Sequence, residues 1–276
     1  MMPEGPEIRR AADRIAEVLE GQQVEQASFS LPKLRHHGKT FSGEKVNRLE
    51  TRGKALLTHF EHGWSIYSHN QLYGVWRVVA RGKLPKTNRS LRLALHTQDH
   101  SALLYSASDI SVWRREEIET HPFLQRIGPD ILSPDLTWQA IAARLDEPRF
   151  RKRSLAALYL DQDFIAGIGN YLRAEILYHA RLHPDRRPQE LSKGERGRLA
   201  RSTLEISWRS YRTAGITNPP KLAAALKRQG LAWEQTRFSV FGREGLPCYG
   251  CDDEIKRWDS QSRRLYGCLS CQPRTE

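Results

Sequence analysis

The chain has 276 residues and a formal net charge of +12, from 44 Lys and Arg against 32 Asp and Glu. Its 39% of hydrophobic residues suffices for packed cores and excludes wholesale disorder. No run approaches 18 consecutive apolar residues, and the charged start MMPEGPEIRR lacks the apolar core of a signal peptide. We therefore expect neither a membrane span nor export, and a cytoplasmic location.

The excess positive charge is concentrated in the second half of the chain. Residues 149–276 carry a net charge of +10, whereas residues 1–148 carry only +2. A Lys/Arg-rich surface of this kind neutralises rows of phosphates and releases their counterions. Nucleic acid is therefore the favoured partner, although charge alone also fits a plain solvated surface.

The predicted elements change in type along the chain. Apolar residues from Ile8 to Leu19 recur at helical spacing and stop at Gly21, which predicts an amphipathic helix. From about Val24 to Ser108, short β-branched and aromatic runs between Gly, Pro and Asn predict a β-sandwich. Helical periodicity then dominates, and a linker, TAGITNPP, precedes a helix-capable KLAAALKRQG. We expect an α+β multidomain chain with domains at 1–130, 131–236 and 237–273.

All four cysteines lie in the last of these segments. Cys248, Cys251, Cys268 and Cys271 form the pattern C-x2-C-x16-C-x2-C, which places thiolates on two tight turns. Two disulfides are a poor alternative in a cytosolic chain. Because sulfur fills every ligand position, we expect one structural Zn²⁺ and no catalytic metal.

The first residues allow either capping or chemistry. Pro6 and Glu7 can simply begin a helix, and composition alone favours that interpretation. If the mature chain begins at Pro3, however, its secondary amine has a pKa of about 8 and can attack a sugar C1′ to form an iminium. Glu4 could then shuttle protons.

Several segments together carry a resemblance to a known family. They are PEGPEIRRAAD, ETRGKALLTHF, YSHNQLYGVWRV, LLYSASDI, HPFLQRIGPDIL, AGIGNYLRAEIL and the four-Cys ribbon. In this order they resemble the formamidopyrimidine-DNA glycosylase/endonuclease VIII family, and most of all its bacterial endonuclease VIII branch. The resemblance runs nearly end to end. It implies a catalytic β-sandwich domain with an N-terminal helix, a helix–two-turn–helix domain and a zinc ribbon.

The resemblance also implies roles for individual residues. Pro3 matches the nucleophile, Glu4 the acid/base and Lys54 a lysine that contacts phosphate and assists β-elimination. Asn170 matches an asparagine that grips a phosphate together with backbone N–H groups at a helix N-terminus, where an anion is favoured. Arg263 matches the hairpin arginine that completes the phosphate clamp and is implicated in δ-elimination, and Arg126 resembles a further backbone contact. Without the family, Lys54 would be an ordinary solvated lysine and Asn170 a helix cap.

Gln71, Leu72 and Tyr73 match the contiguous wedge of endonuclease VIII. An enzyme that acts on a base extrudes it from the duplex, and a leucine between an amide and a flat ring can fill the hole. Taken without the family, Leu72 and Tyr73 would be strand or core residues. The contiguity favours the endonuclease VIII branch. The resemblance to that branch implies a bifunctional glycosylase/AP lyase that removes oxidised bases, with pyrimidines expected, and nicks double-stranded DNA by β,δ-elimination; we expect it to act as a monomer.

Two departures from the family pattern affect these expectations. Met1-Met2-Pro3 would stall methionine removal, so we expect translation to start at Met2; with both methionines retained the amine is blocked. Segment 214–236 does not match the best-known endonuclease VIII sequences, which leaves the lesion range open. The alternative function is a non-catalytic DNA-damage-binding protein that keeps the phosphate clamp.

Overall fold

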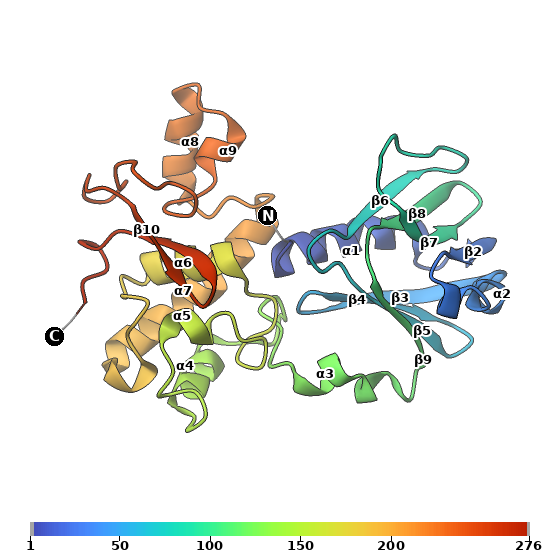
Figure 1. The fold of residues 1–276 in the computed structure, drawn as a ribbon, viewed down its shortest axis with the longest axis horizontal. Helices are drawn as coiled ribbons and strands as arrows, with labels where there is room; N and C mark the ends of the chain where they lie inside the picture. Colours follow the sequence, from blue (N-terminus) through green and yellow to red (C-terminus); the bar gives the residue numbers. More distant parts are fainter. Residues whose placement is uncertain (1–2, 275–276) are drawn as a thin grey trace. The chain divides into compact units, whose positions relative to one another are not determined.

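The structure is a computed structural model and describes residues 3–274. Its contacts divide the chain into two compact units. The first is built around Glu7–Arg126, and the second around Ile127 onward together with the short segment Glu4–Pro6. Figure 1 shows a β-rich first unit and a helical second unit that ends in a small β-hairpin.

The N-terminal helix forms where the apolar spacing predicts it. Helix α1 spans Gly5–Leu19, and its buried positions include Ile8, Ile15 and Leu19, one face of a 3.6-residue repeat. The helix ends before Gly21, whose φ of 72° lies in the left-handed region that glycine tolerates.

The first unit contains two antiparallel sheets, as expected for a β-sandwich. One has the strand order β1-β3-β4-β5-β9 and the other β2-β7-β8-β6. The strands are β1 (Gln23–Val24), β2 (Gln26–Phe29), β3 (Glu44–Arg52), β4 (Ala55–Phe60), β5 (Trp64–His69), β6 (Val75–Ala80), β7 (Leu91–His96), β8 (His100–Tyr105) and β9 (Asp109–Arg114). Because β5 and β6 belong to different sheets, the short segment between them crosses from one sheet to the other.

Apolar side chains of both sheets and of α1 share one core. Leu56 and Ile66 come from the first sheet, Leu95 and Leu104 from the second, and Ile15 from α1. The short helices of this unit are Pro32–Leu34, α2 (His37–Phe41), Ile118–Thr120 and α3 (Pro122–Arg126).

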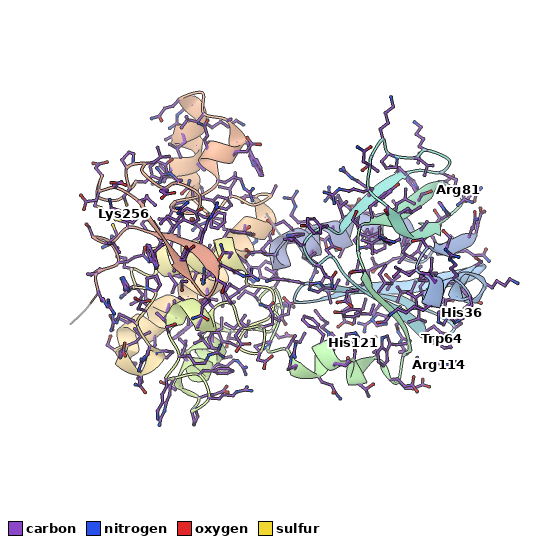
Figure 2. All side chains as sticks on the ribbon, in the orientation of Figure 1. His36, Trp64, Arg81, Arg114, His121 and Lys256 are labelled. Carbon is purple, nitrogen blue, oxygen red and sulfur yellow. The ribbon has the colours of Figure 1, made fainter. Side chains whose placement is uncertain are left out.

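Aromatic side chains of β5 contact residues at the end of β9 and in the segment that follows it. The Arg114 guanidinium lies 4.1 Å from the Trp64 ring centroid, and both residues are labelled in Figure 2. His121 stacks on Tyr67 with a centroid separation of 3.9 Å. These contacts hold the segment after β9 against β5.

The second unit is mainly helical. Its helices are α4 (Trp138–Asp146), α5 (Leu155–Leu158), α6 (Asn170–His179), the 3-10 turn Pro188–Glu190, α7 (Lys193–Arg212), α8 (Pro220–Arg228) and α9 (Trp233–Thr236). Ser192 and Glu195 form a capping box at the start of α7, and Arg186 forms an ion pair with Glu195. Residues 213–219, within the predicted linker, are non-helical.

The Cys-rich tail forms a hairpin that packs on the helices. Strands β10 (Lys256–Ser260) and β11 (Arg263–Gly267) pair antiparallel, and β11 contacts α6. Ala156, Ala174, Val240 and Leu265 join Cys248 in a small apolar core beneath the hairpin. The expected fold class is therefore confirmed. Within residues 3–274, no helix is both long enough and apolar enough to cross a membrane.

Candidate active site and nucleic-acid interface

The Glu4 side chain is buried and held by the start of α6. Its carboxylate accepts hydrogen bonds from the backbone N–H groups of Gly169 (2.8 Å), Tyr171 (2.8 Å) and Leu172 (3.3 Å). Only 1% of Glu4 is exposed. Unpaired N–H groups and the helix dipole at a helix N-terminus favour a negative charge, so this position stabilises an ionised carboxylate.

Glycines make two close approaches between the start of the chain and the segment before α6 possible. A Cβ on Gly169 would lie 2.4 Å from Cδ of Glu4, and a Cβ on Gly5 would lie 3.1 Å from Cα of Gly167. The Gly5 N–H also donates to the Gly167 carbonyl at 2.8 Å. The GIG sequence before α6 therefore shapes a seat for the PEGP segment.

This arrangement changes the expected use of the α6 N-terminus. The donors that the sequence offered to a phosphate at Gly169, Tyr171 and Leu172 go to Glu4. Beside these donors lie the Asn170 side chain and the hairpin, which carries the exposed Arg263 and Arg264.

Asn170 connects α6 to the hairpin. Its Nδ2 donates to the Arg264 carbonyl at 2.8 Å, and its Oδ1 accepts from Nη2 of Arg173 at 2.6 Å. Arg263 and Arg264, at the start of β11, are both exposed. The structure thus brings the predicted clamp residues Asn170 and Arg263 to the same place, with Arg173 behind them.

Arg173 is a fully buried cation at this position. Its Nη1 donates to the Ala156 carbonyl at 3.1 Å, and none of its surface is exposed. Burial lowers the pKa of Arg173 to about 10; the nearby Arg263 charge adds to that effect and Glu4 opposes it. Positive charge therefore accumulates where the clamp is expected to bind a phosphate.

The four cysteines converge. Their Sγ atoms all lie within 4.8 Å of one another, with Sγ–Sγ distances of 3.4 Å for Cys251–Cys268, 3.5 Å for Cys251–Cys271 and 3.8 Å for Cys248–Cys271. Cys248 and Cys268 are buried, and Cys251 is exposed. Four thiols this close together can bind one metal ion.

Lys54 lies in the first unit, in the turn between β3 and β4. Only 7% of it is exposed. The next residue, Ala55, pairs with His69 of β5, and His69 pairs with Asp109 of β9. Burial lowers the pKa of His69, Lys54 lowers it further and Asp109 opposes both. Lys54 therefore lies within electrostatic reach of the last residue of β5.

The predicted wedge begins two residues after His69. Leu72 is 56% exposed and Tyr73 is 67% exposed, so neither belongs to the strand or core that an isolated Leu-Tyr pair would suggest. Gln71 has a φ of 50°, which is unusual for a residue with a side chain. Two large apolar side chains on a short connection form an exposed apolar tip.

The remaining residues and segments singled out from the sequence lie elsewhere in the chain. Arg126 is exposed at the end of α3, and Pro3 immediately precedes Glu4. Met1 and Met2, on which the blocked-amine question depends, lie outside the described residues. Segment 214–236 contains α8, α9 and their connections.

Sequence reasoning did not assign roles to three residues that the structure shows to be important. Glu175 is fully buried, and its carboxylate accepts from the N–H groups of Ser239, Val240 and Phe241, which ties the start of the tail to α6. Arg173 and Glu175 interrupt the apolar run of NYLRAEIL, and charges in a buried helix are a usable signal. No comparable feature of the sequence around His69 indicated a role for that residue.

Comparison with known proteins identifies the family. The formamidopyrimidine-DNA glycosylase N-terminal domain matches residues 2–108, and the formamidopyrimidine-DNA glycosylase H2TH domain matches residues 127–219. The chain belongs to the formamidopyrimidine-DNA glycosylase/endonuclease 8 family, whose members are DNA glycosylases and AP lyases of base excision repair.

The curated relatives point to one branch of this family. Endonuclease 8 of Enterobacter sp. (strain 638) is 48% identical over 271 residues, which cover 98% of this chain and all of the relative. Endonuclease 8 of Escherichia coli (strain K12 / DH10B) is 47% identical over the same coverage.

Solved structures share the whole fold. The MutM (Fpg) protein of Thermus thermophilus superposes with a TM-score of 0.80 at 29% identity, covering 99% of this chain and all of that one. Lactococcus lactis Fpg, in complex with DNA containing N7-benzyl-Fapy-dG, gives a TM-score of 0.81 at 20% identity with the same coverage, which supports the fold alone.

Proposed function

We propose that this protein removes oxidised bases, principally pyrimidines, from double-stranded DNA and then nicks the abasic site by β,δ-elimination. The observation that carries the proposal is the Glu4 carboxylate, buried next in sequence to Pro3 and held by three N–H groups of α6. The 48% identity to an endonuclease 8 supports the choice of pyrimidines.

The chemistry begins with the Pro3 amine, exposed once the preceding methionines are removed. The amine nitrogen attacks C1′ of the damaged nucleotide and loses its proton, and the glycosidic bond breaks with protonation of the departing base. The C1′–O4′ bond then breaks, O4′ takes up a proton, and the nitrogen lone pair forms the iminium. The iminium accepts the electron pair when a C2′ proton is removed, and the C3′–O bond then breaks so that the 3′ phosphate leaves. Removal of the C4′ proton from the resulting conjugated iminium breaks the C5′–O bond, and the 5′ phosphate leaves. Glu4, stabilised as a carboxylate, is positioned to accept protons in this sequence.

The proposed DNA contacts come from both units. Asn170 and Arg263 would clamp a phosphate beside the lesion, Lys54 would contact a phosphate and assist elimination, and Arg126 would bind the backbone. Gln71, Leu72 and Tyr73 would fill the space left by the extruded base. Support comes from the shared position of Asn170 and the hairpin, and from the exposure of Leu72 and Tyr73.

We propose that the ion held by the four cysteines is Zn²⁺ and that its role is structural. Zn–S bonds of about 2.3 Å in a tetrahedron place the sulfurs about 3.8 Å apart. The three Sγ–Sγ distances of 3.4–3.8 Å given above, each between a cysteine of the first pair and one of the second, fit that geometry. The ion would fix the turns that flank the hairpin carrying Arg263. We further propose that the protein acts as a monomer on chromosomal DNA in the cytoplasm.

Borohydride trapping tests the mechanism. Protein beginning at Pro3, confirmed by intact mass spectrometry, is incubated with duplexes containing thymine glycol, dihydrouracil, 8-oxoguanine or an abasic site, and borohydride is added. A covalent protein–DNA adduct is expected, with the pyrimidine lesions processed faster than 8-oxoguanine. The matched control is the same protein with one methionine retained before Pro3.

Two outcomes would contradict the proposal. Cleavage without a trapped adduct would rule out the iminium route. Damage-specific binding without cleavage by the Pro3 form would instead favour a non-catalytic damage-binding protein.

A further inference from the structure

The connection between β5 and β6 is a short, exposed crossing with a fixed shape. It comprises Asn70–Gly74 and passes from one sheet of the sandwich to the other. Its tip presents Leu72 and Tyr73 to solvent. A wedge that enters a base stack must keep its conformation while it separates the stacked bases. The contacts that hold this crossing in place therefore contribute to wedge insertion.

The backbone of the crossing is held at both ends. The Gln71 N–H donates to Nδ1 of His69 at 3.0 Å, while Gln71 itself has a φ of 50°. The Gly74 N–H donates to the Asn70 carbonyl at 2.7 Å, and a Cβ on Gly74 would lie 2.5 Å from that oxygen. A left-handed φ on a residue with a side chain is costly and persists where surrounding contacts impose it.

The contact with Gln71 determines the state of the His69 ring. A backbone N–H can only donate, so Nδ1 must offer a lone pair and the ring proton of a neutral His69 must be on Nε2. Burial lowers the pKa of His69, and Lys54 reinforces this against the opposing charge of Asp109. His69 is therefore neutral at neutral pH, as the hydrogen bond requires.

A second contact orients the Gln71 side chain. Oγ of Ser108, in the segment between β8 and β9, donates to Oε1 of Gln71 at 2.7 Å. Because the oxygen of the Gln71 amide faces Ser108, the NH₂ group forms the other end of the amide and supplies two donors. The carbonyl of Tyr73 also accepts from Nη1 of Arg89, which fixes the other side of the tip.

We propose that His69 and Ser108 are positioning residues for the wedge: His69 holds the backbone of Gln71, and Ser108 orients its amide to donate to acceptors on the base opposite the lesion. This inference rests on the proposed function, in which the wedge enters the duplex. It adds a basis for discriminating the opposing base. It also places one histidine between Lys54 and the wedge.

The test of Ser108 compares opposing bases. Single-turnover cleavage of an abasic site opposite A, C, G and T is measured for the wild type, Ser108→Ala and Gln71→Ala. Ser108→Ala is expected to narrow the spread of the four rates about three- to fivefold, toward that of Gln71→Ala, because the amide can then rotate. Ser28→Ala, at an exposed serine on β2, is the matched control and should keep the wild-type spread.

The test of His69 uses rescue by a residue of different size. The Oδ1 of an asparagine can accept from the N–H two residues later, so His69→Asn should keep the wedge shape, whereas His69→Phe should not. Wedge insertion is followed by 2-aminopurine fluorescence in a duplex with a non-cleavable tetrahydrofuran site, which requires no catalysis. We expect His69→Phe to lower the insertion signal several-fold and His69→Asn to restore most of it.

Distinct results would overturn this inference and the proposed function. If Ser108→Ala keeps the wild-type spread while Gln71→Ala removes it, and His69→Phe inserts like the wild type, the positioning roles are wrong. If the wild type fails to cleave an abasic site, the proposed function is wrong. The fluorescence measurement still shows whether His69 positions the wedge, because insertion requires no catalysis. Melting temperatures identify a variant that fails to fold. If Ser108→Ala or His69→Phe does not fold, Ser108→Cys or His69→Asn, respectively, is compared with the wild type instead.

Discussion

The Glu4 carboxylate and the Gly169 backbone are in direct contact, with Oε2 of Glu4 2.8 Å from the Gly169 nitrogen. They are 165 residues apart in sequence. The contact joins the segment that carries the proposed nucleophile to the N-terminus of α6, and it leaves no room for a side chain at position 169.

Gly169→Ala is therefore expected to displace Glu4. The added Cβ would meet Cδ of Glu4 at 2.4 Å, and misplacing a reacting group by about 1 Å can cost about 10²-fold in rate. Single-turnover glycosylase rates measure the effect, with circular dichroism as a check of folding. Gly194→Ala in α7 is the matched control, because the nearest atom to its new Cβ is 4.0 Å away. An unchanged rate for Gly169→Ala would show that the position of Glu4 is unimportant.

Arg263→Ala is expected to weaken DNA binding in a salt-dependent way. Removing one phosphate contact reduces the slope of log K against log salt concentration by about 1. Fluorescence anisotropy on an abasic-site duplex at several salt concentrations measures the slope. Arg257→Ala is the control, because Arg257 is exposed on the same hairpin but forms an ion pair with Glu244. Equal slopes for both variants would refute a specific phosphate contact at Arg263.

Cys248→Ser is expected to remove the bound metal and loosen the hairpin. Cys248 is buried in the small core beneath β11, so the loss should weaken DNA affinity while leaving the reaction at C1′ unchanged once DNA is bound. Elemental analysis should find one zinc per wild-type chain and much less in the variant. Ser270→Ala, at an exposed serine between two of the cysteines, should behave as wild type. Full affinity without zinc would contradict the role of the ribbon.

The ion-pair cluster on β3 predicts an acid-dependent loss of stability. The His59 ring, whose Nε2 lies 3.4 Å from Oε2 of Glu50, and the charges of Arg52 and Arg48 outweigh burial and lower the pKa of Glu50 from 4.5 to about 2. Because the folded-state pKa is lowered, Glu50 contributes stability above pH 4.5, and that contribution disappears as the pH falls toward 2.

Urea unfolding between pH 7 and pH 3 checks this expectation for Glu50. The difference in free energy of unfolding between the wild type and Glu50→Gln should be largest at neutral pH and should shrink below about pH 4.5. Glu61→Gln, at an exposed carboxylate paired with Lys45, should show little difference at any pH. A difference for Glu50→Gln that stays constant with pH would mean that ionisation of this residue does not contribute.

The elements of the fold were largely accessible from the sequence. The helical spacing up to Leu19 and the β-branched runs from Val24 to Ser108 reflect local periodicities, and α1 and most strands of the two sheets form where they predict. Strand β9 (Asp109–Arg114) lies beyond the predicted range and completes the first sheet. The C-x2-C pairs likewise predicted convergence, because each pair lies on one tight turn. The helical periodicity predicted after the β-rich part is realised only in part, since α5 is only four residues long and a non-helical segment separates it from Asn170.

The sequence alone determined the local features, namely the periodicity, the turn glycines, the closely spaced cysteine ligands and the motifs that identify the family. Tertiary structure decided which partner each polar group takes. The donors of α6 go to Glu4, Asn170 is shared between Arg173 and the hairpin, and Gln71 is held by His69 and Ser108. Buried polar groups must find partners, but nothing in their local sequence specifies a partner that folding brings from a distant part of the chain.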